Sequence, residues 1–412
     1  MVYQPPAGAR DLLPLDVAQK RWVEERLQQV FHRWGYHQII TSTLERLDTL
    51  MAGEAIRRST VIQIQDAESE SLGLRPELTA SIARTSVTRM AGATYPQRLY
   101  YNANVFRRTD ESSHNRQLEF YQAGVELLGG GGTLADAEVL LLLAECLNQL
   151  SLNRWCLILG EAGIARSLLS PFPPHLQNKV RQAIADLDRI TLETLPLSDE
   201  LRQRALLMLD LRGHPADVLQ KVALLQLDTP QLEALDRLKS LIELLDRCFP
   251  VQFGQTARNF PLILDLSLIQ TFDYYTGIVF EVVSDRERPR ILGQGGRYDQ
   301  LLGLYHPQGK TIPGIGFVLN IEDLQQVLLK SDRLPQATPV TNWLVVPTSP
   351  QAYTAAFAYA EKLRNSPHLV RVEMDYGDRE PDAIREYARS HHIQQIAWIE
   401  ADGIPAIEPL TA

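Results

Sequence analysis

The sequence predicts an α+β fold, in which an antiparallel sheet with flanking helices carries a helical insertion and precedes a small C-terminal α/β domain. Two runs rich in β-branched and aromatic residues, 98–107 and 118–128, enclose a polar loop, which is typical of a β-hairpin. Residues 168–249 are rich in Leu, Gln and Asp and contain almost no strand pattern. Residues 342–412 alternate between strand and helix patterns, which indicates a parallel or mixed α/β domain.

Composition places the chain among ordinary globular proteins of two or three domains. It has 412 residues, of which 45% are hydrophobic and 22% are charged. Its net charge of −9 repels nucleic acid unless the positive charges gather on one face. No stretch approaches the ~20 apolar residues of a membrane span, and residues 1–11 contain no apolar signal region. We therefore expect a cytoplasmic protein with no membrane partner.

The sequence contains no pattern for a metal ion or a phosphate-bearing cofactor. Cys146, Cys156 and Cys248 form neither a CxxC pair nor a metal-ligand spacing, so we expect reduced thiols in the hydrophobic core. The glycine run 129–132 lacks the spacing of a phosphate-binding loop and is expected to form a turn. We expect no metal site and no cofactor.

Hydrophobic periodicity separates helices from strands in the first third of the chain. A loop at 5–14 precedes an expected helix over 16–34. A second helix is expected over 79–90, and it starts just after Glu77. A carboxylate is favourable near the positive end of a helix, so Glu77 is either a helix-end residue or a ligand-binding residue. Short strands are expected at 38–41, 61–65 and 72–74.

The same reasoning assigns the rest of the chain. Helices are expected over 136–150 and 321–329, and the stretch 168–249, which prolines interrupt, is expected to be a helical insertion. Residues 331–341 form a polar linker that contains proline. Strands are expected at 155–159, 262–266, 277–283 and 314–318, and the C-terminal domain is expected to alternate through 343–346, 351–363, 370–374, 382–390 and 395–399 without a closing helix.

The returning strand of the hairpin carries polar side chains where an apolar pair is usual. Gln122 and Glu126 lie four residues apart, so both point to the same face of the strand. The polar loop 109–117 cannot bury itself and would lie above that face. This combination predicts a ligand site, although a half-exposed hairpin would show the same pattern.

Four segments of the chain resemble motifs of class II aminoacyl-tRNA synthetases, and most closely those of histidyl-tRNA synthetases. The hairpin 106–129 resembles motif 2, and residues 74–80 (LRPELTA) resemble the RPEGTA segment. Residues 273–277 (DYYTG) resemble the histidine-specific LDYY segment, and residues 295–299 resemble the GGRYD segment. The four matches follow the order of the family and span more than half of the chain.

The resemblance implies a class II aminoacyl-tRNA synthetase-like architecture. Residues 1–330 would form the catalytic-core domain, with its helical insertion at about 168–250. After the linker 331–341, residues 342–412 would form a truncated domain that is similar to the anticodon-binding domain. The insertion and the C-terminal domain show no basic stripe, so we expect no tRNA partner.

The positions that hold ATP in such synthetases are changed in this chain. Arg107 keeps the motif 2 arginine, but Thr109 stands at the motif 2 glutamate and Gln270 stands at the arginine before LDYY. Asp323 replaces the motif 3 arginine. Adenylation requires positive charge around the reacting phosphate, and loss of one such donor costs about 3–4 kcal/mol. The resemblance therefore implies a chain without catalytic residues for adenylation.

The positions that hold the amino acid are kept. By the resemblance, Glu77 would face an α-ammonium group, Gln122 and Glu126 would face the ammonium group or the side chain, and three tyrosines would surround an imidazole ring. A decayed site, in which these polar groups merely satisfy one another, is the alternative. The expected histidine-binding residues are Glu77, Thr79, Arg107, Gln122, Glu126, Tyr274, Tyr275 and Tyr298.

This pattern of loss and retention resembles the ATP phosphoribosyltransferase regulatory subunits of histidine biosynthesis. The resemblance implies that the chain activates the short-form catalytic ATP phosphoribosyltransferase subunit and makes it sensitive to feedback inhibition by L-histidine. It also implies a homodimer core within a hetero-octamer. Histidine would bind either the amino-acid pocket or a subunit interface. The alternatives are an active histidyl-tRNA synthetase and a synthetase-like binding protein with another partner, for example a stress regulator of the kinase type or a protein that binds a tRNA mimic.

Overall fold

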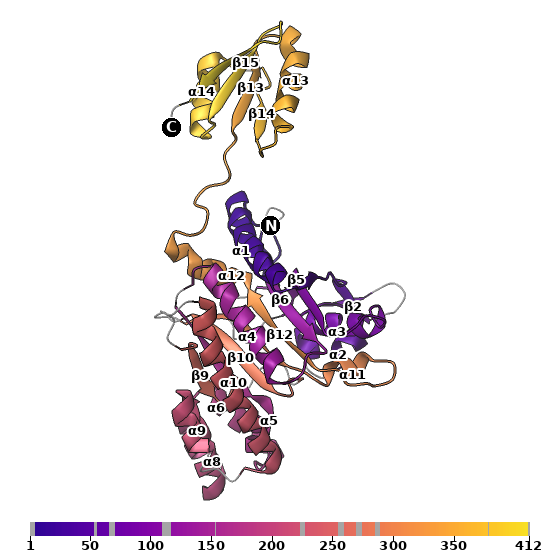
Figure 1. Cartoon of the computed structure of the whole chain (residues 1–412), viewed down its shortest axis with the longest axis vertical. Coiled ribbons are helices and arrows are strands. Elements are labelled where there is room, and N and C mark those ends of the chain that lie inside the picture. The colour runs from indigo at the N-terminus through magenta and orange to yellow at the C-terminus, as the bar shows by residue number, and fades with distance from the viewer. Residues whose placement is uncertain are drawn as a thin grey trace. The chain divides into compact units, whose positions relative to one another are not determined.

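A nine-stranded sheet is the frame of the larger of two compact units (Figure 1). The first unit comprises the N-terminal residues up to Leu12 and Gln19–Leu334, and the second comprises Leu13–Ala18 and Pro335–Ala412. The computed structural model describes residues 5–52, 56–65, 71–108, 117–152, 154–222, 227–253, 259–268, 274–284, 289–377 and 379–410.

The strand order of this sheet is β1-β5-β6-β12-β11-β10-β7-β9-β8. Neighbours from β5 to β7 in this order are antiparallel, whereas β1 pairs with β5 and β9 pairs with β7 in parallel. The expected fold class is confirmed, with parallel pairs only near the two edges. The strands are β1 (His37–Gln38), β5 (Gln97–Phe106), β6 (Glu119–Leu128), β7 (Trp155–Glu161), β8 (Arg212–Gly213), β9 (Leu262–Asp265), β10 (Ile278–Ser284), β11 (Ile291–Arg297) and β12 (Gly314–Asn320).

The predicted hairpin is confirmed as β5 and β6, the longest pair in the sheet. Phe106 pairs with Glu119 at one end, and Gln97 pairs with Leu128 at the other. The half-exposed alternative is wrong, because every residue of β6 from Gln122 onward is buried. Helices and further strands cover the hairpin on both sides, which the local pattern could not reveal. Positions 109–116 of the predicted polar loop lie outside the described residues.

Strand β11 is not predicted by the sequence, because three of its seven residues are glycine and resemble a loop. The close packing of the neighbouring strands requires these glycines. A Cβ atom at Gly293 would lie 2.4 Å from the carbonyl oxygen of Val318, and one at Gly295 would lie 2.3 Å from that of Gly316. Glycine therefore marks a tight position within the sheet here, as it does elsewhere in strands.

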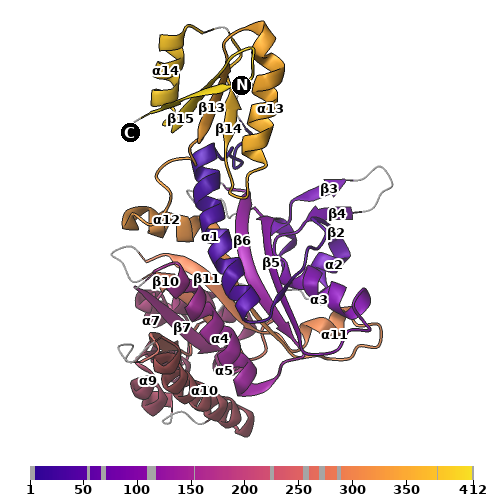
Figure 2. The ribbon, with the colours of Figure 1, turned by 45° about the horizontal axis from the view of Figure 1, so that its top comes forward.

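Helices cover both faces of the sheet (Figure 2). On one face, α1 (Pro14–Arg33) and α4 (Gly132–Gln149) bury an apolar stripe, which includes Val23, Leu27 and Phe31 of α1. On the other face, α3 (Thr79–Thr88) and α11 (Leu301–Tyr305) pack over a second, smaller core. Burial of a large aliphatic or aromatic side chain contributes about 1.5–3 kcal/mol. The second core surrounds the polar face that the sequence predicts as a ligand site.

A half-buried carboxylate joins the helical insertion to the core. The carboxylate of Glu145, on α4, accepts hydrogen bonds from Arg33 Nη2 at 3.0 Å, Trp34 Nε1 at 2.8 Å and Gln252 Nε2 at 2.9 Å. Gln252 belongs to α10 (Thr229–Phe253), the last helix of the insertion. This single carboxylate therefore holds three segments that are far apart in the sequence.

The described part of the segment predicted as an insertion consists of helices, their connections and one short strand. Strand β8 adds to the edge of the large sheet through β9, which the Leu-rich pattern does not predict. The helices are α5 (Ala162–Leu169), α6 (Pro174–Ala185), α7 (Arg189–Thr194), α8 (Asp199–Leu209), α9 (Pro215–Val222) and α10. The short helix α2 (Leu47–Met51) and the strands β2 (Leu44–Arg46), β3 (Gln63–Gln65) and β4 (Ser71–Leu74) form a separate small layer, and α12 (Ile321–Leu328) ends the first unit.

The second unit has a four-stranded sheet of order β14-β13-β15-β16. The expected alternation is confirmed, and one strand is added at its end. Strand β16 (Pro405–Pro409) pairs antiparallel with β15, whereas the other pairs are parallel. The two prolines hide this strand from sequence reasoning, because proline is tolerated mainly in edge strands. The other elements are β13 (Trp343–Pro347), α13 (Tyr353–Arg364), β14 (Val372–Met374), α14 (Pro381–Ser390) and β15 (Gln395–Ile399).

Two further expectations concern the cysteines and membrane spans. All three cysteines are free thiols, as predicted, but only Cys146 is fully buried. Within the described ranges, no helix is both long enough and apolar enough to span a bilayer.

Candidate functional site

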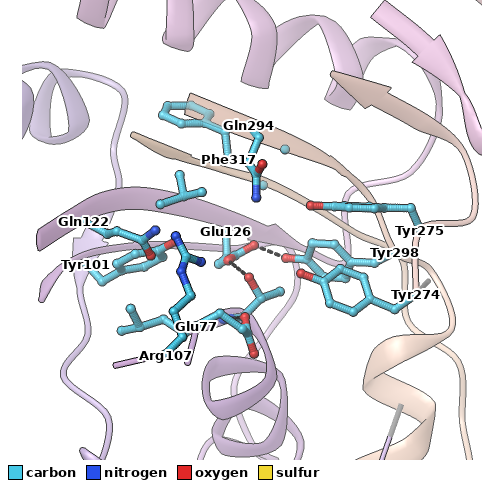
Figure 3. Close-up of a pocket in the computed structure, with 15 residues that line it drawn as sticks. Glu77, Tyr101, Arg107, Gln122, Glu126, Tyr274, Tyr275, Gln294, Tyr298 and Phe317 are labelled. Atoms are coloured by element: carbon cyan, nitrogen blue, oxygen red, sulfur yellow. Dashed lines mark hydrogen bonds between the residues drawn. The ribbon is translucent and has the colours of Figure 1, made fainter. Parts of the chain in front are cut away.

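A cavity opens on the face of the large sheet that carries α3 (Figure 3). It lies over the centre of the sheet, where β5, β6, β12 and β11 are neighbours. All eight residues that the sequence predicts for a ligand site line this cavity. The lining residues are Glu77, Leu78, Thr79, Tyr101, Arg107, Gln122, Glu126, Tyr274, Tyr275, Gln294, Gly295, Tyr298, Gly316, Phe317 and Val318.

Strand β6 places two polar side chains at the base of the cavity. Glu126 pairs in register with Gly316, and Gln122 pairs with Asn320. The Gln122 amide donates a hydrogen bond to Asn320 Oδ1 at 3.2 Å. Because residues i and i+4 of a strand share a face, the predicted common orientation of Gln122 and Glu126 is confirmed.

Glu126 is a buried carboxyl group that forms no ion pair with any residue in the described ranges. Only 1% of the residue is exposed. The Thr79 hydroxyl donates a hydrogen bond to Oε1 at 2.7 Å, and the Tyr298 hydroxyl donates one to Oε2. Burial raises the pKa of Glu126 to about 8; the hydrogen bonds from Tyr298 and Thr79 oppose this rise, and Glu77 adds to it. In the free cavity this group is therefore mostly neutral at pH 7.

Glu77 caps helix α3 and also lines the cavity. Its Oε2 accepts a hydrogen bond from the backbone N–H of Thr79 at 2.5 Å, and its Oε1 accepts one from Ala80 at 2.9 Å. Burial raises the pKa of Glu77, while these hydrogen bonds hold it down. The two predicted roles, helix end and cavity wall, therefore belong to the same side chain.

Three tyrosines form the aromatic side of the cavity. The ring centroids of Tyr274 and Tyr275 lie 4.8 Å apart, and Tyr274 meets Tyr298 edge to face at 5.9 Å. Two glycines make room for these rings. A Cβ atom at Gly296 would lie 2.6 Å from the Tyr275 ring, and one at Gly314 would lie 2.3 Å from the Tyr298 ring.

Arg107 supplies positive charge on the opposite side of the cavity. It follows directly after β5, and its guanidinium lies 4.8 Å from the centre of the Phe120 ring. Burial lowers the pKa of Arg107, while Glu322 and Glu77 raise it. Among the described lining residues it is the single cation. No described residue forms an ion pair with it within 4.0 Å. Its charge is therefore available to a ligand.

Asp323, the residue at the motif 3 position, forms an ion pair outside the cavity. Asp323 Oδ1 lies 3.1 Å from Arg290 Nη1, and Asp323 does not line the cavity. Burial raises the pKa of Asp323, and Arg290 opposes that rise. The other two changed positions, Thr109 and Gln270, lie outside the described residues.

The free space in the cavity is small, about 30 Å³. A water molecule needs roughly 10–15 Å³ on this measure, so about two or three waters would fill it. An amino acid with a ring requires more, which means that lining side chains must move apart when such a ligand enters.

The sequence does not predict the seven other lining residues. The strand register could have found four of them, because Tyr101 pairs with Gly124, Val318 pairs with both Gly124 and Gln294, and Gly316 pairs with Glu126. Directly opposed residues share a face of the sheet. Register depends on the partner strand, so a single segment does not carry it. In the described part of the chain, no group of three His, Cys, Asp or Glu side chains is suited to a metal ion.

The substitution Gly316→Ala is expected to disrupt the cavity at its base. The added Cβ would lie 2.0 Å from Glu126 Oε2 and 2.4 Å from the Val125 carbonyl oxygen, which real contacts do not allow. We expect a loss of about 1–3 kcal/mol in the free energy of unfolding, measured by chemical denaturation. Gly92→Ala is the matched control, because nothing lies within 4 Å of its added Cβ. Equal stability of the two variants would contradict this packing.

Comparison with known proteins shows that this chain is similar to histidyl-tRNA synthetases and to proteins that share their fold. The family model of histidyl-tRNA synthetase matches residues 8–324. A curated protein of Nostoc punctiforme, named ATP phosphoribosyltransferase regulatory subunit, is 70% identical over 411 residues, with full coverage of both chains. A solved structure from Bacillus halodurans, named ATP phosphoribosyltransferase regulatory subunit/histidyl-tRNA synthetase, is 27% identical with a TM-score of 0.78, and the match covers 97% of this chain and 99% of that one. Histidyl-tRNA synthetase of Nostoc sp. PCC 7120 shares the fold at 18% identity and a TM-score of 0.74, over 99% and 97% of the two chains.

Proposed function

This chain belongs to the family of ATP phosphoribosyltransferase regulatory subunits, which has the histidyl-tRNA synthetase fold, and on this basis we propose that it activates the short-form catalytic subunit and makes it sensitive to L-histidine. The observation that carries the proposal is the cavity itself. It gathers two carboxyl groups, one arginine, two amides and four tyrosines over one sheet face. Such a set suits a small zwitterion with a polar, aromatic side chain.

Each part of a histidine molecule has a complementary group in this proposal. The guanidinium of Arg107 binds the α-carboxylate, because charge-assisted pairs of this kind are strong. Glu126 accepts a hydrogen bond from a cationic or N–H group of the ligand, and Glu77 lies near the same region. Tyr274, Tyr275 and Tyr298 surround the ring.

Regulation then follows from linkage between two binding equilibria. If histidine binds one state of the assembly better than another, it shifts the population toward that state. The small free space in the cavity supports such coupling, because the ligand must select or create a wider conformation. We propose that a homodimer of this chain is the centre of a hetero-octamer with catalytic subunits.

Reconstitution with the short-form catalytic subunit of the same organism tests this function. We expect the two proteins to co-elute in gel filtration and the chain to increase ATP phosphoribosyl transfer. Histidine should then reduce the rate by at least about fivefold, since coupling energies of this kind are about 1–3 kcal/mol. A chain with Glu126→Gln should still activate but respond weakly to histidine, which would assign the effector to the cavity. No co-elution and no change in rate would contradict the proposal.

We also propose that the chain does not adenylate histidine. Two arginine positions of the synthetases hold Gln270 and Asp323, and each missing donor costs about 3–4 kcal/mol, or roughly 100- to 1000-fold in rate. The pairing of Asp323 with Arg290 supports the proposal, because the carboxylate at the motif 3 position neutralises the neighbouring guanidinium. The purified chain is expected to show no histidine-dependent ATP–pyrophosphate exchange, with histidyl-tRNA synthetase of the same organism as the positive control. Robust exchange would instead identify an active synthetase.

A further inference from the structure

Gln294 extends into the cavity from β11, and no sequence motif points to it. In register it lies between Val318 of β12 and Glu281 of β10, and its side chain is half buried. Its amide group points into the cavity from the side opposite Glu77 and Arg107 (Figure 3). Phe317, which precedes Val318, also borders this end of the cavity.

The Gln294 amide has no hydrogen-bond partner among the described residues, unlike Glu77, Gln122 and Glu126. Glu77 binds backbone N–H groups, Glu126 binds two hydroxyl groups, and Gln122 binds Asn320. An amide group offers two donors and two lone pairs. A ligand that fills the cavity removes water from this amide, so the amide must then find a partner on the ligand.

The sheet order places Gln294 at the end of the cavity where the ligand's ring belongs. Arg107 follows β5, and two strands, β6 and β12, lie between β5 and β11. Neighbouring strands are about 4.8 Å apart, so the backbones of β5 and β11 are separated by roughly 14 Å. Two residues farther along β11, Gly296 packs against Tyr275 of the aromatic side. A ligand whose carboxylate faces Arg107 thus directs its side chain toward the tyrosines and Gln294.

We propose that Gln294 is a ligand-binding residue of this cavity, which hydrogen-bonds the polar ring of the bound amino acid and selects that ring over apolar rings of similar size. This inference rests on the proposed function and names the residue that sets its ligand specificity. An uncharged amide suits a neutral imidazole, because it can donate to one ring nitrogen or accept from the other. A site that hydrogen-bonds a polar group rejects a ligand without that group, since the protein group would be left unpaired.

The test compares ligand binding by the wild-type chain and by Gln294→Met, whose side chain has a similar length and shape but no hydrogen-bonding group. Calorimetry measures the affinity for L-histidine, and competition against histidine measures the affinity for β-(2-thienyl)alanine, whose ring lacks nitrogen. We expect Gln294→Met to weaken histidine binding about tenfold and to leave thienylalanine binding and the thermal midpoint of the free chain unchanged. Gln325→Met is the matched control, because Gln325 bonds Gln19 at 3.0 Å and does not line the cavity.

Three results would overturn the inference, and they are distinguishable from one another. Wild-type affinity for histidine in Gln294→Met would remove Gln294 from the binding site but leave the proposed function intact. Equal losses for histidine and thienylalanine would show that Gln294 contacts the main-chain part of the ligand, against a role in ring selection. Absence of histidine binding by the wild-type chain would overturn the proposed function itself.

Discussion

Glu126→Gln is expected to weaken L-histidine binding by about 100-fold at pH 7, since a hydrogen bond to a charged group contributes about 1.5–3 kcal/mol. The free protein holds this carboxyl group buried and mostly neutral, with a pKa of about 8. A cationic group of the ligand would favour the carboxylate and lower that pKa. Glutamine has nearly the same shape but cannot become a carboxylate, so the variant removes the charge that the ligand would induce. One of the two hydroxyl groups, of Thr79 or Tyr298, must then turn to accept from the amide N–H.

The proton that Glu126 releases when the ligand binds provides a second measurement of its role. At one pH unit below the pKa of the free group, about 0.9 proton is bound to Glu126, and it leaves when the ligand's cation arrives. Calorimetry in buffers of different ionisation enthalpy should detect that proton with the wild-type chain but not with Glu126→Gln. Ionisation of histidine itself is common to both proteins, so their difference isolates Glu126.

The same group is expected to make the stability of the free chain depend on pH. Its pKa is about 8 in the folded state against 4.5 as the ordinary value, so the folded state binds more protons between these pH values. Its stabilising contribution is complete below pH 4.5 and is lost as pH rises through 8. Glu126→Gln should lack this part of the loss. Glu119→Gln, on the same strand but outside the cavity, is the control. Identical affinity, proton release and pH profile in Glu126→Gln and wild type would exclude Glu126.

Arg297→Met is expected to lower the free energy of unfolding by about 3–5 kcal/mol, because it leaves the buried Asp136 carboxylate without its cation. Arg297 is 7% exposed, and its Nε and Nη2 donate to Asp136 Oδ1 at 2.9 and 2.6 Å. Its Nη1 donates to Asp299 at 2.9 Å and to the Gly130 carbonyl at 3.1 Å. Burial raises the pKa of Asp136, and Arg297 opposes that rise.

Chemical denaturation at two pH values checks this expectation. The loss should be largest at pH 7 and smaller toward pH 5, because protonation of Asp136 removes the unpaired buried charge. The double variant Asp136→Asn/Arg297→Met should recover part of the stability. Arg290→Met breaks the half-exposed pair with Asp323, just before the same strand, and should cost at most about 1 kcal/mol. Similar losses in the free energy of unfolding for Arg290→Met and Arg297→Met would contradict the expectation that the buried ion pair contributes more than the half-exposed one.

Local patterns were sufficient for much of the architecture. The alternation of β5 and β6, the Leu-rich helices of the insertion and the strand–helix alternation of the second unit are properties of single segments. The four motif-like segments predicted the candidate site as well, because their residues were recognised by type and spacing. All eight of those residues line one cavity, although their role toward histidine stays a prediction.

Tertiary structure alone decided which strands are neighbours and which side chains share a face. Gln294 and Tyr101 enter the cavity through register with distant strands, and β11 becomes a strand only because its glycines allow close packing. The protonation of Glu126 likewise depends on burial by segments far away in the sequence. A sequence pattern records the periodicity of one segment, whereas register, burial and electrostatics arise from contacts between segments.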